Sequence, residues 1–390
     1  MTPGFSGFLD IELGEKGLAC LYIIGQVSHF YFEVLNYMNE SYENLLETFK
    51  EQREKRKNFH KNSKILIVDA MNTFLRAFAA IPTRNKNGVH VGGIGGFLKS
   101  MGAAIKKFNP TRCIVVFDGK GGSKRRKKIF GDYKSGRSSG GYNRNYDFEN
   151  EDEEEAMKRQ IVRTVEYMQC LPVTLMSIDY IEADDVIAYL TKQVYNDPEE
   201  HEKIIMSSDR DFLQLADEDT KIWSPTKKNV YDPEAIVEEY GVPPRNFIIW
   251  RMIEGDSSDS IPGVKYVGKK KVQNKLGDLI QREDPQRVDD VIEYSKERID
   301  ESNTYKRIVD NEEVMRRNWK LMQLYNVEIS AEKKSQITDL ARKEIPPLDK
   351  QCFREKFFHD QMHAAIKNMD NWLKKTFREL NRMRNVEEQG

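Results

Sequence analysis

The stretch Ile65-Leu66-Ile67-Val68-Asp69 is a continuous apolar run that ends in an acid. Such a run is typical of a strand that is buried on both faces of a parallel sheet. Three further candidate strands lie at residues 113–117, 173–178 and 203–206, and segments with helical patterns separate them. Strands that alternate with helices predict an α/β fold, with a mostly parallel central sheet flanked by helices.

The chain divides into three parts by its patterns. Residues 1–62 are predicted to be a helical N-terminal extension, because Glu33–Asn62 is polar, lacks Gly and Pro, and carries apolar residues at helical spacing. Residues 63–240 are predicted to hold the α/β domain, with a basic segment at about 120–155. Residues 241–390 are predicted to be mostly helical, because strand signals fade after Pro243.

Composition permits a packed core and leaves the choice of partner open. The chain has 390 residues, of which 39% are hydrophobic and 32% charged, so one large domain or two ordinary ones are expected. The net charge of −1 is the sum of a basic block and an acidic block that cancel. A near-neutral total of this kind does not exclude a nucleic-acid partner.

The cysteines and the apolar segments bear on the compartment. Four cysteines are widely spaced and form no C-x-x-C pair, which predicts no disulfide framework and a reducing cytoplasm. The apolar stretch Leu18–Phe32 is interrupted by polar residues and is too short to span a membrane. The sequence therefore predicts a soluble protein of the cytoplasm that has no membrane partner.

Acidic residues gather where the predicted strands end. Asp69 and Asp118 each end a strand, and Asp209 and Asp211 follow the fourth. In open α/β sheets, ligands bind beyond the carboxyl ends of the strands, so parallel strands bring these acids to one edge. The full set of nine is Asp69, Asp118, Glu182, Asp184, Asp185, Asp209, Asp211, Asp256 and Asp259.

Such a set points to divalent cations. Up to nine carboxylates in one pocket cannot all stay ionised unaided, because like charges raise one another's pKa. Oxygen ligands suit Mg²⁺ or Mn²⁺ rather than zinc, and two such ions about 4 Å apart can hydrolyse a phosphodiester. The alternative is that the acids are helix caps or turn residues. That alternative fits Asp184 or Asp259 alone better than acids at the ends of several successive strands.

Five segments occur in an order that resembles the 5′-nuclease (flap endonuclease) superfamily. They are Ile65–Asn72, Val115–Lys120, Ile181–Val186, Ser208–Asp211 and Gly255–Gly263. The resemblance covers roughly Lys64 to Leu279 and is strongest to the bacteriophage 5′→3′ exonuclease and RNase H branch. It implies a PIN-like α/β fold and a nuclease that works in replication, in the host cytoplasm if a phage encodes it.

The resemblance also implies an activity and a division of the acids. One Mg²⁺ is implied for Asp69, Asp118, Glu182 and Asp184, and a second for Asp185, Asp209, Asp211, Asp256 and Asp259; Mn²⁺ is an alternative ion. The implied reaction is phosphodiester hydrolysis that leaves a 5′-phosphate. The implied substrates are 5′ flaps, nicked duplex DNA and RNA–DNA hybrids, as in primer removal.

The basic segment is predicted to meet nucleic acid. Residues Lys120–Arg137 include eight Lys or Arg and one acid, which attracts a phosphate backbone, although a solvated loop has the same composition. The resemblance places Tyr133, Lys134 and Arg137 at the base of an arch, where the cations contact the scissile phosphate and the ring stacks on a base. Arg76 is predicted to be a further phosphate contact.

A helix–hairpin–helix is predicted at about residues 243–281. Its glycines, Gly263 and Gly268, permit tight turns and close approach to a phosphate, and Lys269, Lys270 and Lys271 add charge. The resemblance implies an element that grips duplex DNA and holds K⁺ on its carbonyl groups. Tyr266 stands where glycine is frequent in such hairpins, which bears on the K⁺ site more than on the duplex contact.

Partners and rival functions complete the prediction. The amphipathic segment Asn371–Arg384 is interpreted as core packing, with docking of a single-strand-binding protein or sliding clamp as the alternative, and the chain is expected to be a monomer. One rival function is a PIN-like endoribonuclease, which would not need a duplex-gripping hairpin. Another is a non-catalytic scaffold for branched DNA, which would be expected to have lost some of the acids.

Overall fold

A computed structural model describes residues 60–138, 142 and 152–385. The predicted N-terminal helix lies outside the described residues, and so does part of the predicted arch, at residues 139–141 and 143–151. Within the described residues, no helix is both long and apolar enough to cross a membrane.

A six-stranded sheet forms the centre of the fold. Its strands are β1 (Lys64–Asp69), β2 (Arg112–Phe117), β3 (Thr174–Ser177), β4 (Glu202–Met206), β5 (Thr220–Ser224) and β6 (Asn229–Tyr231), in the order β3-β2-β1-β4-β5-β6. The first five are parallel and β6 is antiparallel. The predicted mostly parallel sheet is confirmed, and the β5–β6 hairpin is an addition that the sequence did not predict.

The central strand β1 is buried on both faces, as its apolar run predicts. Leu66 and Val68 enter one hydrophobic core, and Ile65 and Ile67 enter the other. All four side chains are fully buried. In the parallel pairing of β1 with β2, Asp69 lies opposite Val116. Asp118 follows Val116 by two residues, so Asp69 and Asp118 lie at the same edge of the sheet.

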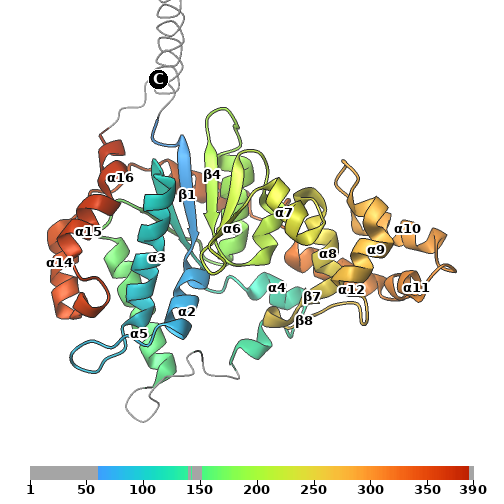
Figure 1. The fold of residues 1–390 in the computed structure, drawn as a ribbon, viewed down its shortest axis with the longest axis horizontal. Helices are drawn as coiled ribbons and strands as arrows, with labels where there is room; N and C mark the ends of the chain where they lie inside the picture. The colour runs from blue at the N-terminus through green and yellow to red at the C-terminus, as the bar shows by residue number, and fades with distance from the viewer. Residues whose placement is uncertain (1–59, 139–141, 143–151, 386–390) are drawn as a thin grey trace, which may run out of the picture. The chain divides into compact units, whose positions relative to one another are not determined.

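Helices cover both faces of the sheet (Figure 1). The core of Leu66 and Val68 is shared with α2 (Ala70–Ala80), α3 (Gly92–Phe108), α5 (Glu153–Met168), α14 (Lys350–His359), α15 (Met369–Thr376) and α16 (Arg378–Met383). The core of Ile65 and Ile67 is shared with α6 (Ala183–Tyr189), α7 (Pro233–Tyr240), α8 (Phe247–Glu254), α9 (Lys269–Ile280), α10 (Val288–Glu297), α11 (Asn303–Asp310), α12 (Glu312–Met322) and α13 (Ala331–Arg342). The mostly helical character of the C-terminal third is thus confirmed.

The C-terminal helices return to the α/β part of the chain. Leu373, Phe377 and Leu380 are fully buried in the core that includes α3. Trp372 lies so close to α3 that a Cβ at Gly102 would come within 2.9 Å of its ring. The interpretation of this amphipathic stripe as core packing is therefore confirmed.

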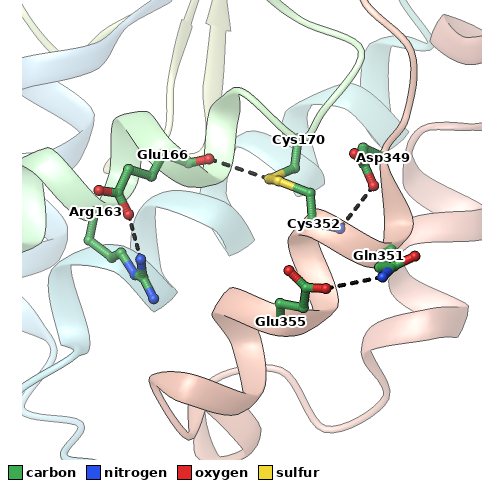
Figure 2. The surroundings of a disulfide bond; sticks show 7 residues. All are labelled: Arg163, Glu166, Cys170, Asp349, Gln351, Cys352 and Glu355. Atoms are coloured by element: carbon green, nitrogen blue, oxygen red, sulfur yellow. Dashed lines mark hydrogen bonds and ion pairs between the residues drawn. A yellow bond between two sulfur atoms is a disulfide. The ribbon is translucent and has the colours of Figure 1, made fainter.

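A disulfide, which the sequence did not predict, joins this C-terminal part to the end of α5. Cys170 follows α5 and Cys352 lies in the first turn of α14, with Cα atoms 5.8 Å apart (Figure 2). Asp349 sets this approach: its backbone N–H donates to the carbonyl of Cys170, and its side chain accepts from the backbone N–H of Cys352. The cysteines are 182 residues apart in sequence, so spacing gave no sign of the pairing.

Reduction of this bond is expected to destabilise the protein. The bond closes a loop of 182 residues, and the entropy of such a loop corresponds to at most about 5 kcal/mol of unfolding free energy. Reductant should lower the urea midpoint of the wild type but leave that of Cys352→Ser unchanged. Cys113 is buried and present in both proteins, so it controls for other thiol effects. A wild-type midpoint that ignores reductant would contradict the disulfide.

Candidate metal centre and nucleic-acid contacts

The acids at the carboxyl edge are held by the starts of the helices that follow the strands. Asp69 ends β1 and accepts the backbone N–H of Asn72 at 3.1 Å, and its other oxygen accepts the hydroxyl of Ser207 at 2.9 Å. Asp118 follows β2 and accepts the N–H of Ala183, in the first turn of α6, at 2.8 Å. Asp209 caps the 3₁₀ helix Arg210–Leu215. Capping does not exclude metal binding, because each carboxylate oxygen has two lone pairs and one hydrogen bond uses only one of them.

Two buried arginines each bind a pair of the predicted acids. Arg126 lies on α4 (Lys124–Ile129) and is 2% exposed. Its guanidinium contacts Glu182 and binds both oxygens of Asp185, at 2.9 and 3.1 Å. Arg251 on α8 is fully buried and contacts Asp211 at 2.5 Å and Asp256 at 2.6 Å. Four of the nine acids thus have a fixed partner cation, which holds them in place.

Glu182 has a second cation. The ammonium of Lys134 pairs with Glu182, and the hydroxyl of Tyr133 donates to the same carboxylate at 3.2 Å. Burial alone would raise the pKa of Glu182, but Arg126 and Lys134 outweigh it and hold that pKa at about 2. Glu182 is therefore charged at all physiological pH values, with or without a bound metal.

The remaining acids include four that form no ion pair with any described residue: Asp69, Asp118, Asp184 and Asp209. Burial raises the pKa of Asp69 to about 7, and the nearby charges of Asp118 and Asp209 add to the rise. Burial also raises the pKa of Asp184, with contributions from Asp209 and Asp69. Lys134 and Arg126 offset part of the rise in the pKa of Asp184, but no described cation forms an ion pair with any of the four carboxylates.

This set fits hard divalent cations. All four offer carboxylate oxygen, the ligand that Mg²⁺ and Mn²⁺ prefer. Among the described residues, no three of the nine acids bring ligand oxygens within 4.8 Å of one another.

A tighter cluster of ligand types lies at the opposite edge of the sheet and does not fit a metal. His60, Glu200 and His201 have ligand atoms within 4.8 Å of one another. However, Nδ1 of His60 accepts the backbone N–H of Asn62 at 3.1 Å. The proton of a neutral His60 ring is then on Nε2, which leaves that atom without a lone pair for a cation.

The predicted arch residues have different environments. Tyr133 is 2% exposed, so its ring is not presented for the base stacking that the sequence predicted. Lys134 has a left-handed backbone, with φ of 59°, and its N–H donates to the carbonyl of Asp259 at 2.9 Å. Arg137 belongs to the 3₁₀ turn Ser135–Ser138. Arg76 is exposed and donates to Thr226 at 2.8 Å, beside the carboxyl edge.

The lysines and glycines predicted in the hairpin differ in their contacts with the rest of the protein. The ammonium of Lys269 donates to the carbonyl of Glu239 and that of Lys271 to the carbonyl of Tyr266, at 2.9 and 2.8 Å. Lys270 is exposed, and its side chain forms no hydrogen bond, ion pair or ring contact with another described residue. Gly263 is required by packing, because a Cβ there would lie 2.1 Å from the carbonyl of Glu254. Gly268 precedes α9 and has open space around it.

Sequence reasoning missed Arg126 and Arg251 as parts of the site. Arg126 is one of several cations in Lys124–Ile129, and no spacing marks it as the buried one. Arg251 did carry a signal, because it is the only basic residue in the mostly apolar helix Phe247–Glu254. A charged residue is rarely buried unless it is paired, so its position in this helix was a sign of a buried ion pair that the sequence analysis did not use.

Divalent ions are expected to stabilise the protein more at high pH. The pKa of Asp69 is raised to about 7, so in the metal-free protein this group favours folding when protonated, and that contribution is lost as pH rises through 7. Cations bind only the ionised form, so protons compete with them below that pKa. The increase in thermal midpoint on adding Mg²⁺ should be larger at about pH 8 than at about pH 6. An equal increase at both pH values would contradict this coupling.

A family model and individual relatives both match this chain to 5′-3′ exonucleases. A model of the family described as the 5′-3′ exonuclease, N-terminal resolvase-like domain, matches residues 64–241. A 5′-3′ exonuclease of Aquifex aeolicus is 31% identical over 214 residues, which are 54% of this chain and 68% of that protein. DNA polymerase I of Bacillus subtilis is 31% identical over 213 residues, or 53% of this chain but only 22% of the polymerase.

The fold is also similar to that of a solved nuclease. A crystal structure of the T5 D15 protein with metal ions has a TM-score of 0.51 and 19% identity, and the match covers 81% of this chain and 99% of that one. The bacteriophage T5 D15 flap endonuclease in complex with DNA and metal ions gives a TM-score of 0.50 and 18% identity. At this identity the likeness concerns the fold, and it extends through the helical C-terminal part.

Proposed function

The chain belongs to the 5′-3′ exonuclease family, whose members are metal-dependent nucleases, and from this membership we propose that it cuts flaps, nicked duplex DNA and RNA–DNA hybrids near free 5′ ends. The observation that carries the proposal is the group of four neighbouring carboxylates, Asp69, Asp118, Asp184 and Asp209, which have no ion-pair partner among the described residues. In replication this activity removes primers, in the host cytoplasm if the gene is a phage gene.

The acids divide into two roles in this proposal. Asp69, Asp118, Asp184 and Asp209 hold two Mg²⁺ ions, and Mn²⁺ serves as a substitute. Bound cations of this kind activate a water molecule and stabilise the charge that develops on the phosphate and the leaving oxygen. The acids bound to Arg126 and Arg251, and Asp259 beside Lys134, shape the site around these four ligands. Buried arginines fix their geometry before substrate arrives.

The cations of the chain also divide into two roles. Lys134 and Arg137 contact the scissile phosphate, which is supported by the contact between Lys134 and Glu182 at the acid cluster. Arg76 contacts a neighbouring phosphate, and Lys270 in the hairpin binds the duplex backbone at a distance. All of these groups come from one chain, so the proposal needs only a monomer.

Two predicted additions are not part of the proposal. The ammonium of Lys271 already binds the carbonyl of Tyr266, so that hairpin oxygen has a cation without K⁺. The apolar stripe predicted as an alternative docking site for a single-strand-binding protein or clamp is buried at Leu373, Phe377 and Leu380. Neither observation weakens the nuclease assignment.

A substrate panel tests the proposed function. Purified protein is incubated with 5′-labelled flap, nicked duplex and RNA–DNA hybrid, with Mg²⁺ or with EDTA. We expect Mg²⁺-dependent cleavage near the 5′ end of each, and no cleavage of a single-stranded RNA of the same sequence. Cleavage of the free RNA in preference to the duplexes would instead favour an endoribonuclease. Tight binding of the flap without cleavage in any divalent ion would favour a scaffold.

A further inference from the structure

Tyr180 has an environment that is unfavourable for a tyrosine. Its backbone φ is 68°, in the left-handed region, which a bulky residue adopts only with strain. Its side chain is 57% exposed. Among the tyrosines, phenylalanines and tryptophans of the described residues, only Tyr266 is more exposed, and it too has a positive φ, of 65°. The folded chain gains little from the ring of Tyr180, which suggests that a ligand uses it.

The backbone of Tyr180 is fixed by close packing of two loops. Its N–H donates to the carbonyl of Lys120 at 3.0 Å. In the facing loop, a Cβ at Gly119 would lie 1.7 Å from the carbonyl of Ile178, and a Cβ at Gly122 would lie 2.8 Å from that of Ile181. The glycines after β2 therefore let the loop before α6 approach closely, and this packing sets the conformation of Tyr180 independently of its side chain.

The same two loops carry acids of the metal centre. Tyr180 precedes Glu182 by two residues, so their Cα atoms are at most about 7 Å apart. Gly119 follows Asp118, and its N–H donates to the carbonyl of Ile181 at 3.0 Å. The backbone of Tyr180 therefore lies near that of two acids of the metal centre, after the end of the edge strand β3.

One exposed cation lies against the ring, and others are on the same helix. The ammonium of Lys124, at the start of α4, is 5.1 Å from the ring centroid of Tyr180. Lys127 and Lys128 are also exposed on this helix. Sites for single-stranded nucleic acid combine an aromatic ring, on which a base stacks, with cations that bind the backbone. Tyr133, the aromatic residue first predicted to stack, is buried and does not supply such a ring.

We propose that Tyr180 is a stacking platform for an unpaired nucleobase of the substrate, and that Lys124 binds a phosphate of the same strand. The platform favours substrates that have an unpaired 5′ strand, such as flaps, over fully paired nicks. This inference rests on the proposed nuclease function and names the feature of the substrate that the site selects.

Binding in Ca²⁺ to a flap and to a nicked duplex of equal length tests the platform. Tyr180→Gly should weaken flap binding by about 5- to 100-fold, the range for loss of one stacked base, and nick binding by less than about twofold. Tyr180→Phe should bind both like the wild type. Phe358→Ala removes another exposed ring, 54% exposed and on α14, and should change neither. A 2-aminopurine in the flap should be quenched by the wild type and by Tyr180→Phe but not by Tyr180→Gly.

A stability measurement excludes misfolding as the cause. Glycine adopts a φ of 68° without strain, so the thermal midpoint of Tyr180→Gly should stay within about 2 °C of the wild type or rise. Loss of flap affinity in a protein of unchanged stability then reflects the missing ring.

The outcomes separate the platform from the nuclease assignment. If the wild type cleaves nicked duplex in Mg²⁺ while Tyr180→Gly keeps full flap affinity, or loses flap and nick affinity equally, the platform is overturned and the nuclease assignment stands. If no protein cleaves any substrate in Mg²⁺, the nuclease assignment fails, and a flap-specific loss in Tyr180→Gly still supports the platform.

Discussion

Asp209→Asn is expected to slow single-turnover cleavage of a flap by at least ~100-fold, with folding intact and substrate binding in Ca²⁺ largely kept. Asp209 is one of the four acids without an ion-pair partner among the described residues, and its charge raises the pKa of both Asp69 and Asp184. Asparagine keeps the size of the side chain but removes the charge that a divalent cation needs. Asp118→Asn should have a similar effect, because Asp118 also acts on Asp69.

A matched variant controls for a general loss of negative charge. Glu218 is exposed and precedes β5, at the opposite edge of the sheet. Glu218→Gln should leave the cleavage rate within about twofold of the wild type, as a surface substitution away from the site does. Rates near the wild-type value for Asp209→Asn and Asp118→Asn at saturating Mg²⁺ would contradict the assignment of these acids to the metal centre.

Lys134→Ala should reduce single-turnover cleavage by roughly 10- to 1000-fold, the scale of losing one electrostatic stabiliser of the transition state. Its ammonium pairs with Glu182 at the acid cluster, where the scissile phosphate is proposed to lie. Because this contact is felt mainly in the transition state, duplex affinity in Ca²⁺ should change little. Glu182 keeps its buried partner Arg126, so the variant is expected to fold, as a thermal midpoint would show.

Lys270→Ala is expected to reduce duplex affinity rather than the cleavage rate, the opposite of Lys134→Ala. Lys270 is exposed in the hairpin, whereas its neighbours Lys269 and Lys271 donate to backbone carbonyls. Loss of one phosphate contact should weaken duplex binding and reduce the log–log salt slope by about 1. Cleavage at saturating enzyme should be spared. If Lys134→Ala lost only affinity, or Lys270→Ala lost only turnover, the roles of the arch and the hairpin would be reversed.

Three of the strands that the sequence predicted share one property. β1, β2 and β4 each contain at least three consecutive apolar residues that are buried, and a run of this kind has few other interpretations. β5 and β6 were not predicted. In β5, buried and half-buried positions alternate, so its pattern is that of a half-solvated strand rather than a strand buried on both faces.

The sequence predicted which acids belong to the site, but not which cations pair with them. The acids could be predicted because they come directly after the predicted strands, and the carboxyl ends of parallel strands meet at one edge of the sheet. Some of these acids pair with Arg126 or Arg251, because the packing of α4 and α8 buries these two arginines. Which cations become buried depends on the tertiary fold, so the sequence pattern did not reveal it. The stacking role predicted for Tyr133 failed for the same reason, because its ring enters the core beside Ile248 and Ile261.

Neither the disulfide nor the packing surface of the C-terminal helices could be predicted from local sequence patterns. The pairing of Cys170 with Cys352 exists only because α14 packs beside the end of α5. The amphipathic stripe of α15 predicted burial, but nothing local specified which surface it covers. Contacts between residues 182 positions apart depend on the whole fold, and no local pattern encodes them.

The central claim is that Asp69, Asp118, Asp184 and Asp209 hold the divalent ions. Calorimetric titration with Mn²⁺ tests it directly, without substrate and without turnover. At about pH 8, where Asp69 is ionised, the wild type should bind two Mn²⁺ ions, and Asp209→Asn should lose one of them or bind it at least ~10-fold more weakly. Glu218→Gln should titrate like the wild type. Absence of Mn²⁺ binding by the wild type, or an unchanged titration for Asp209→Asn, would contradict the claim.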